Sequence, residues 1–393
     1  MKLEMAGDDR LYLRGPRPRL SVRKGDVRLV DLFSGCGGLT LGVEEASRQL
    51  GFHLDARLAV ERHPDIAATY EANFSPVYGG GPQTVENWFD RNPFQALSEV
   101  ERSSQRRVGR TDILVGGPPC QGHSTLNNHT RGDDPKNALY NVMVRAAEVL
   151  EPRMVMIENV PALERDSRNT LERSIKALTR LGYRVDHGVV SVTGIGVPQQ
   201  RKRHVVLAHL TASPALSTAV DAASVERART LEWAIRDLSD ITASTMLDTA
   251  GVMSPENKKR AEYLLRTGEY DLPNRLRPAC QRGPHKYKSM YGRLSWSEPA
   301  QTITTGFGSP GQGRYLHPER QRTLTPHEAA RLQFLPDWFD FRPIRHRTFL
   351  AEAIGNAVPP KLAYVLARHL LALGLPARTR PRVTRSSFAV ASP

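Results

Sequence analysis

Short apolar segments alternate with amphipathic segments along the first half of the chain. The apolar runs predict buried strands at residues 27–33, 55–61, 111–117, 153–160, 183–192 and 203–210. Between most of them, apolar residues recur with helical spacing, at 39–50, 64–74, 137–151 and 170–182. Strands that alternate with helices are typical of a parallel sheet covered by helices on both faces. The pattern therefore predicts an α/β fold.

The alternation stops after residue 210. Residues 211–321 are richer in Ser, Thr, Pro and Gly and lack a clear period, which indicates a separate unit. Helical spacing returns at 324–334, where Thr325 and Glu328 predict a capping box, and at 359–374, where Pro360 suits a first helical turn. We expect these helices to rejoin the first domain, which would then comprise residues 27–210 and 322–376.

The two ends of the chain are basic and aperiodic. Residues 1–26 are rich in Arg and contain Pro16 and Pro18, which predicts a loosely ordered basic arm, and residues 377–393 predict a frayed basic tail. The whole chain has 55 Lys and Arg against 41 Asp and Glu, a net charge of +14. Such a surplus favours a polyanionic partner. With 39% hydrophobic and 24% charged residues, the composition excludes a disordered or fibrous protein.

Cysteine use and hydropathy narrow the class further. The three cysteines, Cys36, Cys120 and Cys280, are far apart in the sequence, which disfavours a disulfide framework and a structural zinc site. No run of about 18 apolar residues and no apolar leader is present. We therefore expect a reduced, metal-free protein that is soluble in the cytoplasm, with no membrane partner.

The segment DLFSGCGG, residues 31–38, joins the first predicted strand to a helix. Backbone amides at such a turn, and the positive end of the helix, can face an anionic group of a nucleotide-like cofactor. Thr40 stands where the dinucleotide fingerprint requires its third glycine, which argues against NAD. Glu61, at the end of the next strand, is placed to accept hydrogen bonds from ribose hydroxyls. The alternative is an ordinary glycine turn.

Cys120 follows Pro118 and Pro119 directly after a predicted strand, at the edge where open parallel sheets bind ligands. A thiolate is a strong nucleophile, although a cysteine taken alone is more often a buried apolar residue. Glu158 ends the next buried strand and would project at the same edge, where a carboxyl group can act as a proton donor. The pair predicts a nucleophile with an adjacent acid.

Two basic segments point to nucleic acid. In QQRKR, residues 199–203, alternation places Gln199, Arg201 and Arg203 on one side of the chain, although such a cluster is often only a solvated face. Residues 273–297 contain three aromatic residues, no acidic residue and six basic ones. The six basic residues are Arg275, Arg277, Arg282, Lys286, Lys288 and Arg293. Basic residues interleaved with aromatics are typical of a nucleic-acid-binding surface.

In their order, these motifs resemble those of the bacterial DNA (cytosine-5)-methyltransferases. The resemblance covers about residues 27–375 and rests on DLFSGCGG, Glu61, PPCQ, ENV, QQRKR, RTLTPHEAARLQ and GNAVPP. It implies the fold of the S-adenosylmethionine-dependent methyltransferases, which is Rossmann-like with a mostly parallel sheet. It also implies that residues 211–321 form a smaller, inserted target recognition domain.

The resemblance also implies a cofactor site. S-adenosyl-L-methionine would be held by Phe33, Gly35, Gly37, Glu61 and Asn356. The chain departs from the family pattern at residues 77–85, which lack the Asp that commonly lies near the adenine amino group. Gln83 or a backbone carbonyl would have to take its place.

The implied reaction transfers a methyl group to carbon 5 of a cytosine flipped out of a specific duplex sequence, through a covalent adduct with Cys120. Glu158 would act on N3 of the base and Arg203 on its O2 atom, while Arg201 would order the loop or touch a DNA phosphate. Residues 122–137 would form a lid that closes on DNA, the alternative being an ordinary surface loop.

The implied partner is double-stranded DNA, bound by a monomer, and a cognate restriction endonuclease would act separately. Two rival hypotheses stay open. One is an RNA cytosine methyltransferase of similar architecture, against which the long insertion argues. The other is a catalytically silent DNA-binding protein, which the presence of Cys120, Glu158 and Arg203 opposes.

Overall fold

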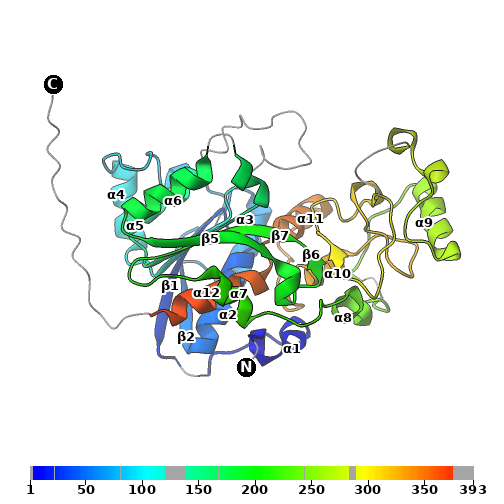
Figure 1. Ribbon diagram of the computed structural model, residues 1–393, viewed down its shortest axis with the longest axis horizontal. Helices are drawn as coiled ribbons and strands as arrows, with labels where there is room; N and C mark the ends of the chain where they lie inside the picture. Colours follow the sequence, from blue (N-terminus) through cyan, green and yellow to red (C-terminus); the bar gives the residue numbers. More distant parts are fainter. Residues whose placement is uncertain are drawn as a thin grey trace.

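The computed structural model describes residues 3–374 apart from 22, 80, 120–138, 167–168, 243 and 283–288. Its centre is a six-stranded sheet with the strand order β2-β1-β3-β4-β7-β5 (Figure 1). The strands are β1 (Gly25–Leu32), β2 (Phe52–Val60), β3 (Ile113–Gly116), β4 (Met154–Asn159), β5 (Arg184–Ser191) and β7 (Lys202–His209). The first four are mutually parallel, whereas β7 runs antiparallel to both β4 and β5. The predicted α/β fold with a mostly parallel sheet is confirmed.

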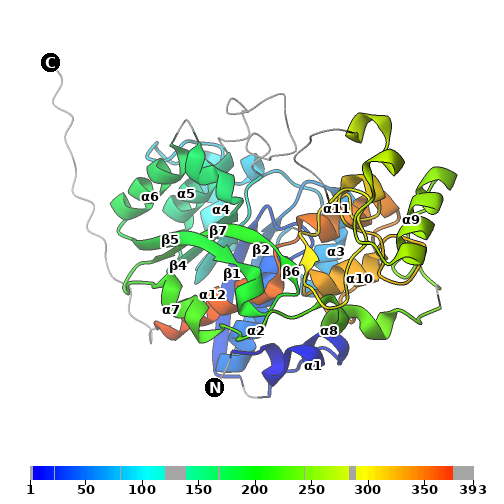
Figure 2. The same cartoon turned by 45° about the vertical axis from the view of Figure 1, so that its right-hand side comes forward.

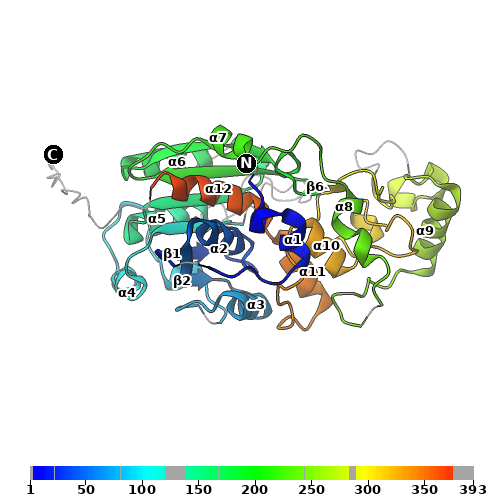
Figure 3. The same cartoon turned by 90° about the horizontal axis from the view of Figure 1, so that it is seen from below.

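Helices cover both faces of this sheet (Figures 1 and 3). One face carries α2 (Gly38–Leu50), α3 (Pro64–Phe74), α7 (Leu216–Ala222) and α12 (Pro360–Ala372). The other carries α4 (Glu99–Val108), α5 (Leu139–Leu150) and α6 (Thr170–Arg180). Successive strand residues belong to opposite faces, so that Leu29 and Val115 join the first core and Val30 and Leu114 the second. Burial on both faces explains why these strands read as continuous apolar runs.

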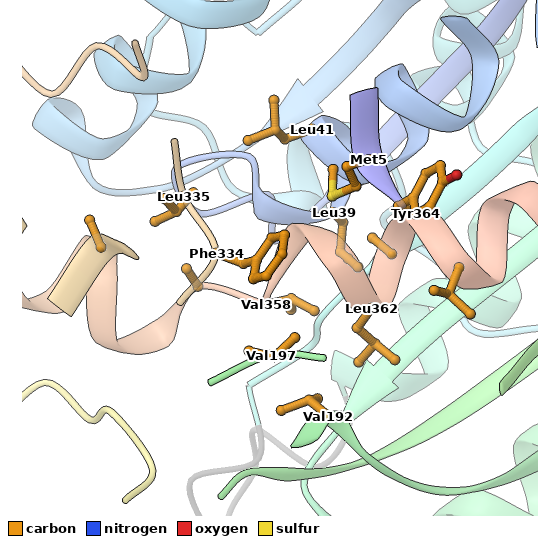
Figure 4. Close-up of a cluster of buried hydrophobic side chains, with 14 of the residues drawn as sticks. Met5, Leu39, Leu41, Val192, Val197, Phe334, Leu335, Val358, Leu362 and Tyr364 are labelled. Atoms are coloured by element: carbon orange, nitrogen blue, oxygen red, sulfur yellow. The ribbon is translucent and has the colours of Figure 1, made fainter. Parts of the chain in front are cut away.

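The N-terminal segment is ordered, which corrects the expectation of a loose arm for residues 1–26. It forms a 3₁₀ turn, η1 (Met5–Gly7), and the short helix α1 (Asp9–Arg14). Met5, Tyr12 and Leu13 are each at most 1% exposed. Figure 4 shows Met5 beside Tyr364 of α12, within the cluster that includes Leu39 of α2. Three apolar side chains therefore anchor a segment whose basic residues dominate its sequence.

The second unit has little regular structure and lies to one side of the sheet domain (Figures 1 and 2). Its longest helix is α9 (Pro255–Thr267), which packs through Ala261 and Leu264 on Met253, Leu272 and Leu316. The irregular sequence of this region thus corresponds to loops around a small apolar cluster. Helix α7 packs on β5 and α12, so residues 216–222 lie with the sheet domain, beyond the boundary expected at residue 210.

Among the C-terminal helices, α12 packs on α2 and α11 (Arg347–Asn356) contacts α3. Thr325 and Glu328 form the expected capping box at the start of α10 (Pro326–Leu332), and Pro360 occupies the first turn of α12. Helix α11 lies between them in the sequence, and α8 (Leu231–Ile235) contacts α10. No helix in the described part of the chain is long and apolar enough to cross a membrane.

Several predicted features fall outside the described residues: Cys120, the proposed lid at 122–137, Lys286, Lys288 and the tail at 377–393. Two further strands, β6 (Gln199–Gln200) and β8 (Ala300–Gln301), pair in parallel and connect the sheet domain to the second unit.

Candidate active site

The predicted cofactor residues Phe33, Gly35, Gly37 and Glu61 come together where β1 and β2 end. Phe33, Gly35 and Gly37 have φ angles of 58°, 54° and 98°, so the loop is built from left-handed residues. The carboxylate of Glu61 spans this loop, because its Oε2 accepts the amide of Gly35 at 3.1 Å and its Oε1 that of His63 at 2.8 Å. Glu61 therefore holds the glycine loop and keeps lone pairs free for a further donor.

Close backbone contacts explain the remaining glycines of this motif. A Cβ atom on Gly37 would lie 2.2 Å from the ring of Phe74, and one on Gly38 would lie 2.3 Å from the carbonyl oxygen of Val358. Val358 belongs to GNAVPP, the segment that begins at the end of α11 with Gly355 and the exposed Asn356. The structure thus brings the two ends of the chain's motif series, DLFSGCGG and GNAVPP, into contact.

The loop has features that fit a polar ligand such as S-adenosyl-L-methionine. The hydroxyl of Ser34 is buried and has no hydrogen-bond partner among the residues that the structure describes. A Cβ at Gly35 would meet no atom within 4 Å, so the space beside this residue is open. Gln83, a candidate for the adenine, already accepts a 2.6 Å hydrogen bond at Oε1 from Trp88. The adenine amino group needs an acceptor, so either the second lone pair of Gln83 Oε1 or a nearby backbone carbonyl is left for that predicted contact.

Two buried groups under the loop are structural. The Thr40 hydroxyl, which replaces the third glycine of the dinucleotide fingerprint, donates to Asp31 at 2.6 Å. Burial raises the pKa of Asp31 to about 7 despite this hydrogen bond. Burial also raises the pKa of the Cys36 thiol to about 12, so that Cys36 is not a thiolate near neutral pH. Its burial and its raised pKa disfavour Cys36 as the nucleophile.

Glu158 lies at the predicted edge of the sheet and is 8% exposed. Its Oε1 pairs with Nε of Arg203 at 2.6 Å, and Arg203 also donates to the carbonyl of Lys202 at 2.8 Å. The β4–β7 register brings this about, since Glu158 pairs with Val205, two residues after Arg203. The structure therefore joins two of the three predicted catalytic residues in an ion pair.

The segment that leads into Cys120 passes directly beside this ion pair. A Cβ atom on Gly117 would lie 3.3 Å from Oε2 of Glu158, so glycine leaves room for the carboxylate. The side-chain amide of Asn159 donates to the carbonyl of Pro118 at 3.1 Å. Asn159 was not predicted as a site residue, although its position directly after Glu158 on a buried strand is a signal that could have found it. These contacts fix the chain two residues before Cys120.

Arg201 does not lie on a DNA-facing surface, which corrects one predicted DNA contact. It is 3% exposed, and its guanidinium donates to the carbonyls of Ile303 at 2.8 Å and Gly355 at 3.4 Å. Burial and the neighbouring Arg203 lower its pKa to about 9, so the side chain stays charged at neutral pH. Arg201 therefore orders the loop, the other role expected for it.

A pair of buried glutamines joins the same segments. Gln199 donates to Oε1 of Gln333 at 2.7 Å and accepts from the amide of Ile303 at 3.1 Å. Gln333 in turn donates to the carbonyl of Ile354 at 2.7 Å. Gln333 is the last residue of RTLTPHEAARLQ, and its structural role was not predicted. Hydrogen bonds thus connect QQRKR, RTLTPHEAARLQ and GNAVPP around the site.

The basic residues of 273–297 differ in their surroundings. Arg277 is 6% exposed and donates to the carbonyl of Leu272 at 3.1 Å, which leaves little surface for the DNA contact predicted for it. Arg293 donates to three backbone carbonyls, among them those of Glu269 and Pro318, and so stabilises loops of the second unit. Arg275 and Arg282 are exposed, and their contact with DNA stays a prediction.

Comparison with known proteins places this site in a family. The family described as C-5 cytosine-specific DNA methylase matches residues 27–372. The type II methyltransferase M1.BsuMI of Bacillus subtilis (strain 168) is 42% identical over 90% of this chain and 83% of its own length. The type II methylase M.HgiDII of Herpetosiphon aurantiacus is 30% identical over 90% and 98%.

A solved structure has a similar fold. The crystal structure of a prophage-encoded E. coli protein, described as a DNA modification methyltransferase, covers 88% of this chain and 99% of its own with a TM-score of 0.60 at 24% identity. The fold, the order of the motifs and the sequence matches agree. The chain therefore belongs to the C-5 cytosine-specific DNA methylase family and is a DNA (cytosine-5)-methyltransferase of the bacterial type II class.

Proposed function

We propose that the protein transfers a methyl group from S-adenosyl-L-methionine to carbon 5 of a cytosine that is flipped out of a specific duplex DNA sequence, through a covalent adduct with Cys120. The observation that carries this proposal is the Glu158–Arg203 ion pair, which lies beside the segment leading into Cys120. Catalysis on a cytosine requires a group that protonates or hydrogen-bonds its ring nitrogen N3. A carboxylate that is held by an arginine next to the nucleophile can supply this group.

The chemistry requires both Cys120 and Glu158. Carbon 5 of cytosine is a poor nucleophile because the ring is aromatic. Attack of the Cys120 thiolate forms a bond from Sγ to carbon 6 and breaks the carbon 5–carbon 6 π bond. The electron density moves onto N3, to which Glu158 donates a proton or a hydrogen bond, and N3 gives this proton back when the adduct breaks down. Bound S-adenosyl-L-methionine supplies the methyl group to carbon 5. Water then removes the carbon 5 proton, the Sγ–carbon 6 bond breaks, and the thiolate is restored.

Base flipping follows from the position of the carboxylate. Glu158 lies at the edge of a buried strand and is 8% exposed, so a base stacked in a duplex could not reach it. Extrusion of the base costs about a few kcal/mol, which contacts with phosphates and groove edges would offset. Arg203, the candidate for the cytosine O2 atom, would also keep Glu158 oriented when the base enters.

Phe33, Gly35, Gly37, Glu61 and Asn356 would hold the cofactor. The free hydroxyl of Ser34 and the open space at Gly35 support this assignment. Glu61 would accept hydrogen bonds from the ribose hydroxyls, while the glycine amides at the start of α2 would face an anionic group. The enzyme would act as a monomer on double-stranded DNA in the cytoplasm, with any cognate restriction endonuclease acting separately.

We predict that Cys120→Ser abolishes methyl transfer and leaves cofactor binding intact, because a serine hydroxyl is hardly ionised. Wild-type protein should form a covalent, denaturant-resistant adduct with duplex DNA that contains 5-fluorocytosine, since the fluorine blocks the final proton removal. Cys280→Ser is the matched control, because Cys280 is exposed and, although it lies in the basic segment 273–297, it is none of the residues predicted to contact DNA. Methylation by the Cys120→Ser protein, or no adduct with the wild type, would contradict the covalent mechanism.

The nucleic-acid substrate is tested separately. Tritiated methyl transfer to duplex DNA and to tRNA should be measured side by side, followed by bisulfite sequencing of the DNA product. We expect transfer to DNA at one defined sequence. Transfer to tRNA alone would replace this proposal with the RNA methyltransferase hypothesis, and transfer to neither would favour a silent DNA-binding protein.

A further inference from the structure

An open groove of about 280 Å³ lies where β6 and β8 connect the sheet domain to the second unit. Its lining includes three glutamines, Gln200, Gln301 and Gln312, together with Ser289 and Thr302. None of the described residues that line the groove carries a charge. The groove therefore offers hydrogen-bonding groups without the arginines and lysines that bind phosphate.

The β6–β8 pair makes a fixed floor for two of the glutamines. Gln200 and Gln301 are direct partners in the parallel register. Their neighbours Gln199 and Ala300 are fully buried, so alternation turns Gln200 and Gln301 to the opposite, open side. The hydroxyl of Thr302 donates to the carbonyl of Gln200 at 2.6 Å and ties the two strands further.

The third glutamine is held by tight packing. A Cβ atom on Gly306 would lie 2.6 Å from Cβ of Gln312, so only a glycine permits this approach. The hydroxyl of Tyr315, on the same wall, donates to the carbonyl of Thr302 at 2.8 Å. Within the described part of the chain, the side-chain amides of Gln200, Gln301 and Gln312 have no hydrogen-bond partner among protein groups. The three side-chain amides are therefore available to a ligand, while hydrogen bonds and close packing hold the backbone that carries them.

The groove opens close to the reacting groups. Gln200 precedes Arg203 by three residues, which is at most about 10 Å of extended chain, and Arg203 pairs with Glu158. Duplex DNA that delivered a cytosine to Glu158 would therefore place its neighbouring base pairs near this groove.

We propose that Gln200, Gln301 and Gln312 read base edges beside the target cytosine and that at least one of them recognises an adenine. This inference rests on the proposed methylation of duplex DNA. A glutamine amide carries one donor and one acceptor in the spacing of adenine N6 and N7, which makes it the usual partner of adenine in the major groove. Arginines give affinity for any phosphate, whereas these uncharged amides discriminate between bases.

The test begins with the wild-type enzyme, whose target sequence is mapped by bisulfite sequencing on a randomised duplex library. Each adenine of that target is then replaced by 7-deazaadenine, which lacks the N7 acceptor. At one position we expect the wild-type methylation rate at limiting DNA to fall about tenfold or more. The three glutamines are then replaced one at a time, in the variants Gln200→Ala, Gln301→Ala and Gln312→Ala. In at least one variant, the methylation rate on normal DNA should fall by a similar factor and should fall no further on the modified duplex. That variant should also accept other bases at the same position of the target.

Gln321→Ala is the matched control, because Gln321 is exposed on the second unit and bonds only the carbonyl of Lys258. It should keep the wild-type target profile. A target without an A·T pair, or three variants with the wild-type profile, would overturn the inference while leaving the proposed methylation intact. A wild-type enzyme that does not methylate duplex cytosine at all would overturn both.

Discussion

The carboxylate of Glu158 has one side held by Arg203 and the other facing the segment that leads into Cys120. The two oxygens of this carboxylate therefore have different surroundings. Oε1 is committed to the guanidinium, whereas Oε2 lies beside Gly117, whose missing side chain leaves room next to this oxygen. An incoming cytosine would therefore meet Oε2.

We predict that Glu158→Gln lowers the single-turnover methylation rate by about 10²- to 10⁴-fold, the usual contribution of a general acid. The rate should fall because the amide of glutamine cannot give N3 a proton. Folding should be unaffected because glutamine keeps the shape of the glutamate side chain. Glu172→Gln, on the exposed face of α6, serves as the control and should leave the rate unchanged. A decrease of less than about tenfold would make Glu158 a structural residue at the end of its strand.

For single residues, the sequence predicted a position at the edge of the sheet where that position depends only on the residue's own strand. It missed contacts with residues that are distant in the sequence. Glu61 and Glu158 follow buried strands, and parallel strands bring their ends to one edge. Arg201 shares its side of the chain with Arg203, as alternation requires. The break between β6 and β7 nevertheless turns it toward Ile303 and Gly355, which lie 102 and 154 residues away.

Among the elements, the N-terminal segment is tied to α12 by a buried cluster of charges. Lys361 donates to Oδ1 of Asp9 at 2.9 Å, and Arg229 pairs with Oδ2 of Asp9 at 2.6 Å. Asp9 and Lys361 are each 1% exposed. Arg229 also pairs with Glu4 at 3.3 Å, whereas Asp9 is the carboxylate that contacts the buried ammonium of Lys361.

We predict that Asp9→Ala lowers the free energy of unfolding by about 3–5 kcal/mol, because it leaves the buried ammonium of Lys361 without its carboxylate partner. Asp8→Ala is the comparison, since exposed Asp8 only caps α1 and its loss should cost about 0.5–2 kcal/mol. Urea unfolding followed by circular dichroism measures both. Equal losses in the two variants would show that the buried cluster adds nothing beyond a helix cap.

Hydrophobic periodicity predicted some of the helices and strands and missed other features of their arrangement. It predicted the strands and helices of the sheet domain because each has its own apolar face. It could not predict that β7 runs antiparallel, since alternation along a strand does not depend on the direction of its neighbours. It also missed α1, because Tyr12 of this six-residue helix packs on Phe334 and Trp338, which are distant in sequence and which no local pattern reveals.

On the scale of the whole molecule, two buried histidines in different regions each accept hydrogen bonds from two backbone amides. His209, at the end of β7, accepts the amides of Thr211 and Ala212 at Nδ1, each at 3.0 Å. His317, in the second unit, accepts the amides of Glu319 and Arg320 at Nδ1, each at 3.1 Å. Both rings are fully buried, and burial is the main reason why the pKa of each is lowered to about 4.

These contacts predict that the enzyme loses stability in mild acid. A protonated imidazole cannot accept at Nδ1, so the folded protein keeps both rings neutral, whereas the unfolded chain binds protons near pH 6.5. Unfolding therefore takes up one proton at each histidine between about pH 6.5 and pH 4, and stability falls as the pH falls through that range. Two groups act in the opposite sense. Burial raises the pKa of Asp31 to about 7, so the folded protein takes up this proton at a higher pH than the unfolded chain does. Burial lowers the pKa of His327, but hydrogen bonds to Asp337 and Asp248 raise it more.

Urea midpoints measured from pH 7.5 to pH 5 test this prediction. In the double variant His209→Gln with His317→Gln, each glutamine oxygen can accept the same backbone amides without titrating, so the midpoint should fall less steeply with acid than in the wild type. His53→Gln is the control, since His53 is exposed and accepts no such pair of amides in the described structure. A double variant with the wild-type slope would show that these histidines do not set the acid sensitivity. The next residues to test would be His204, whose pKa burial lowers to about 4, and His369, whose pKa burial also lowers.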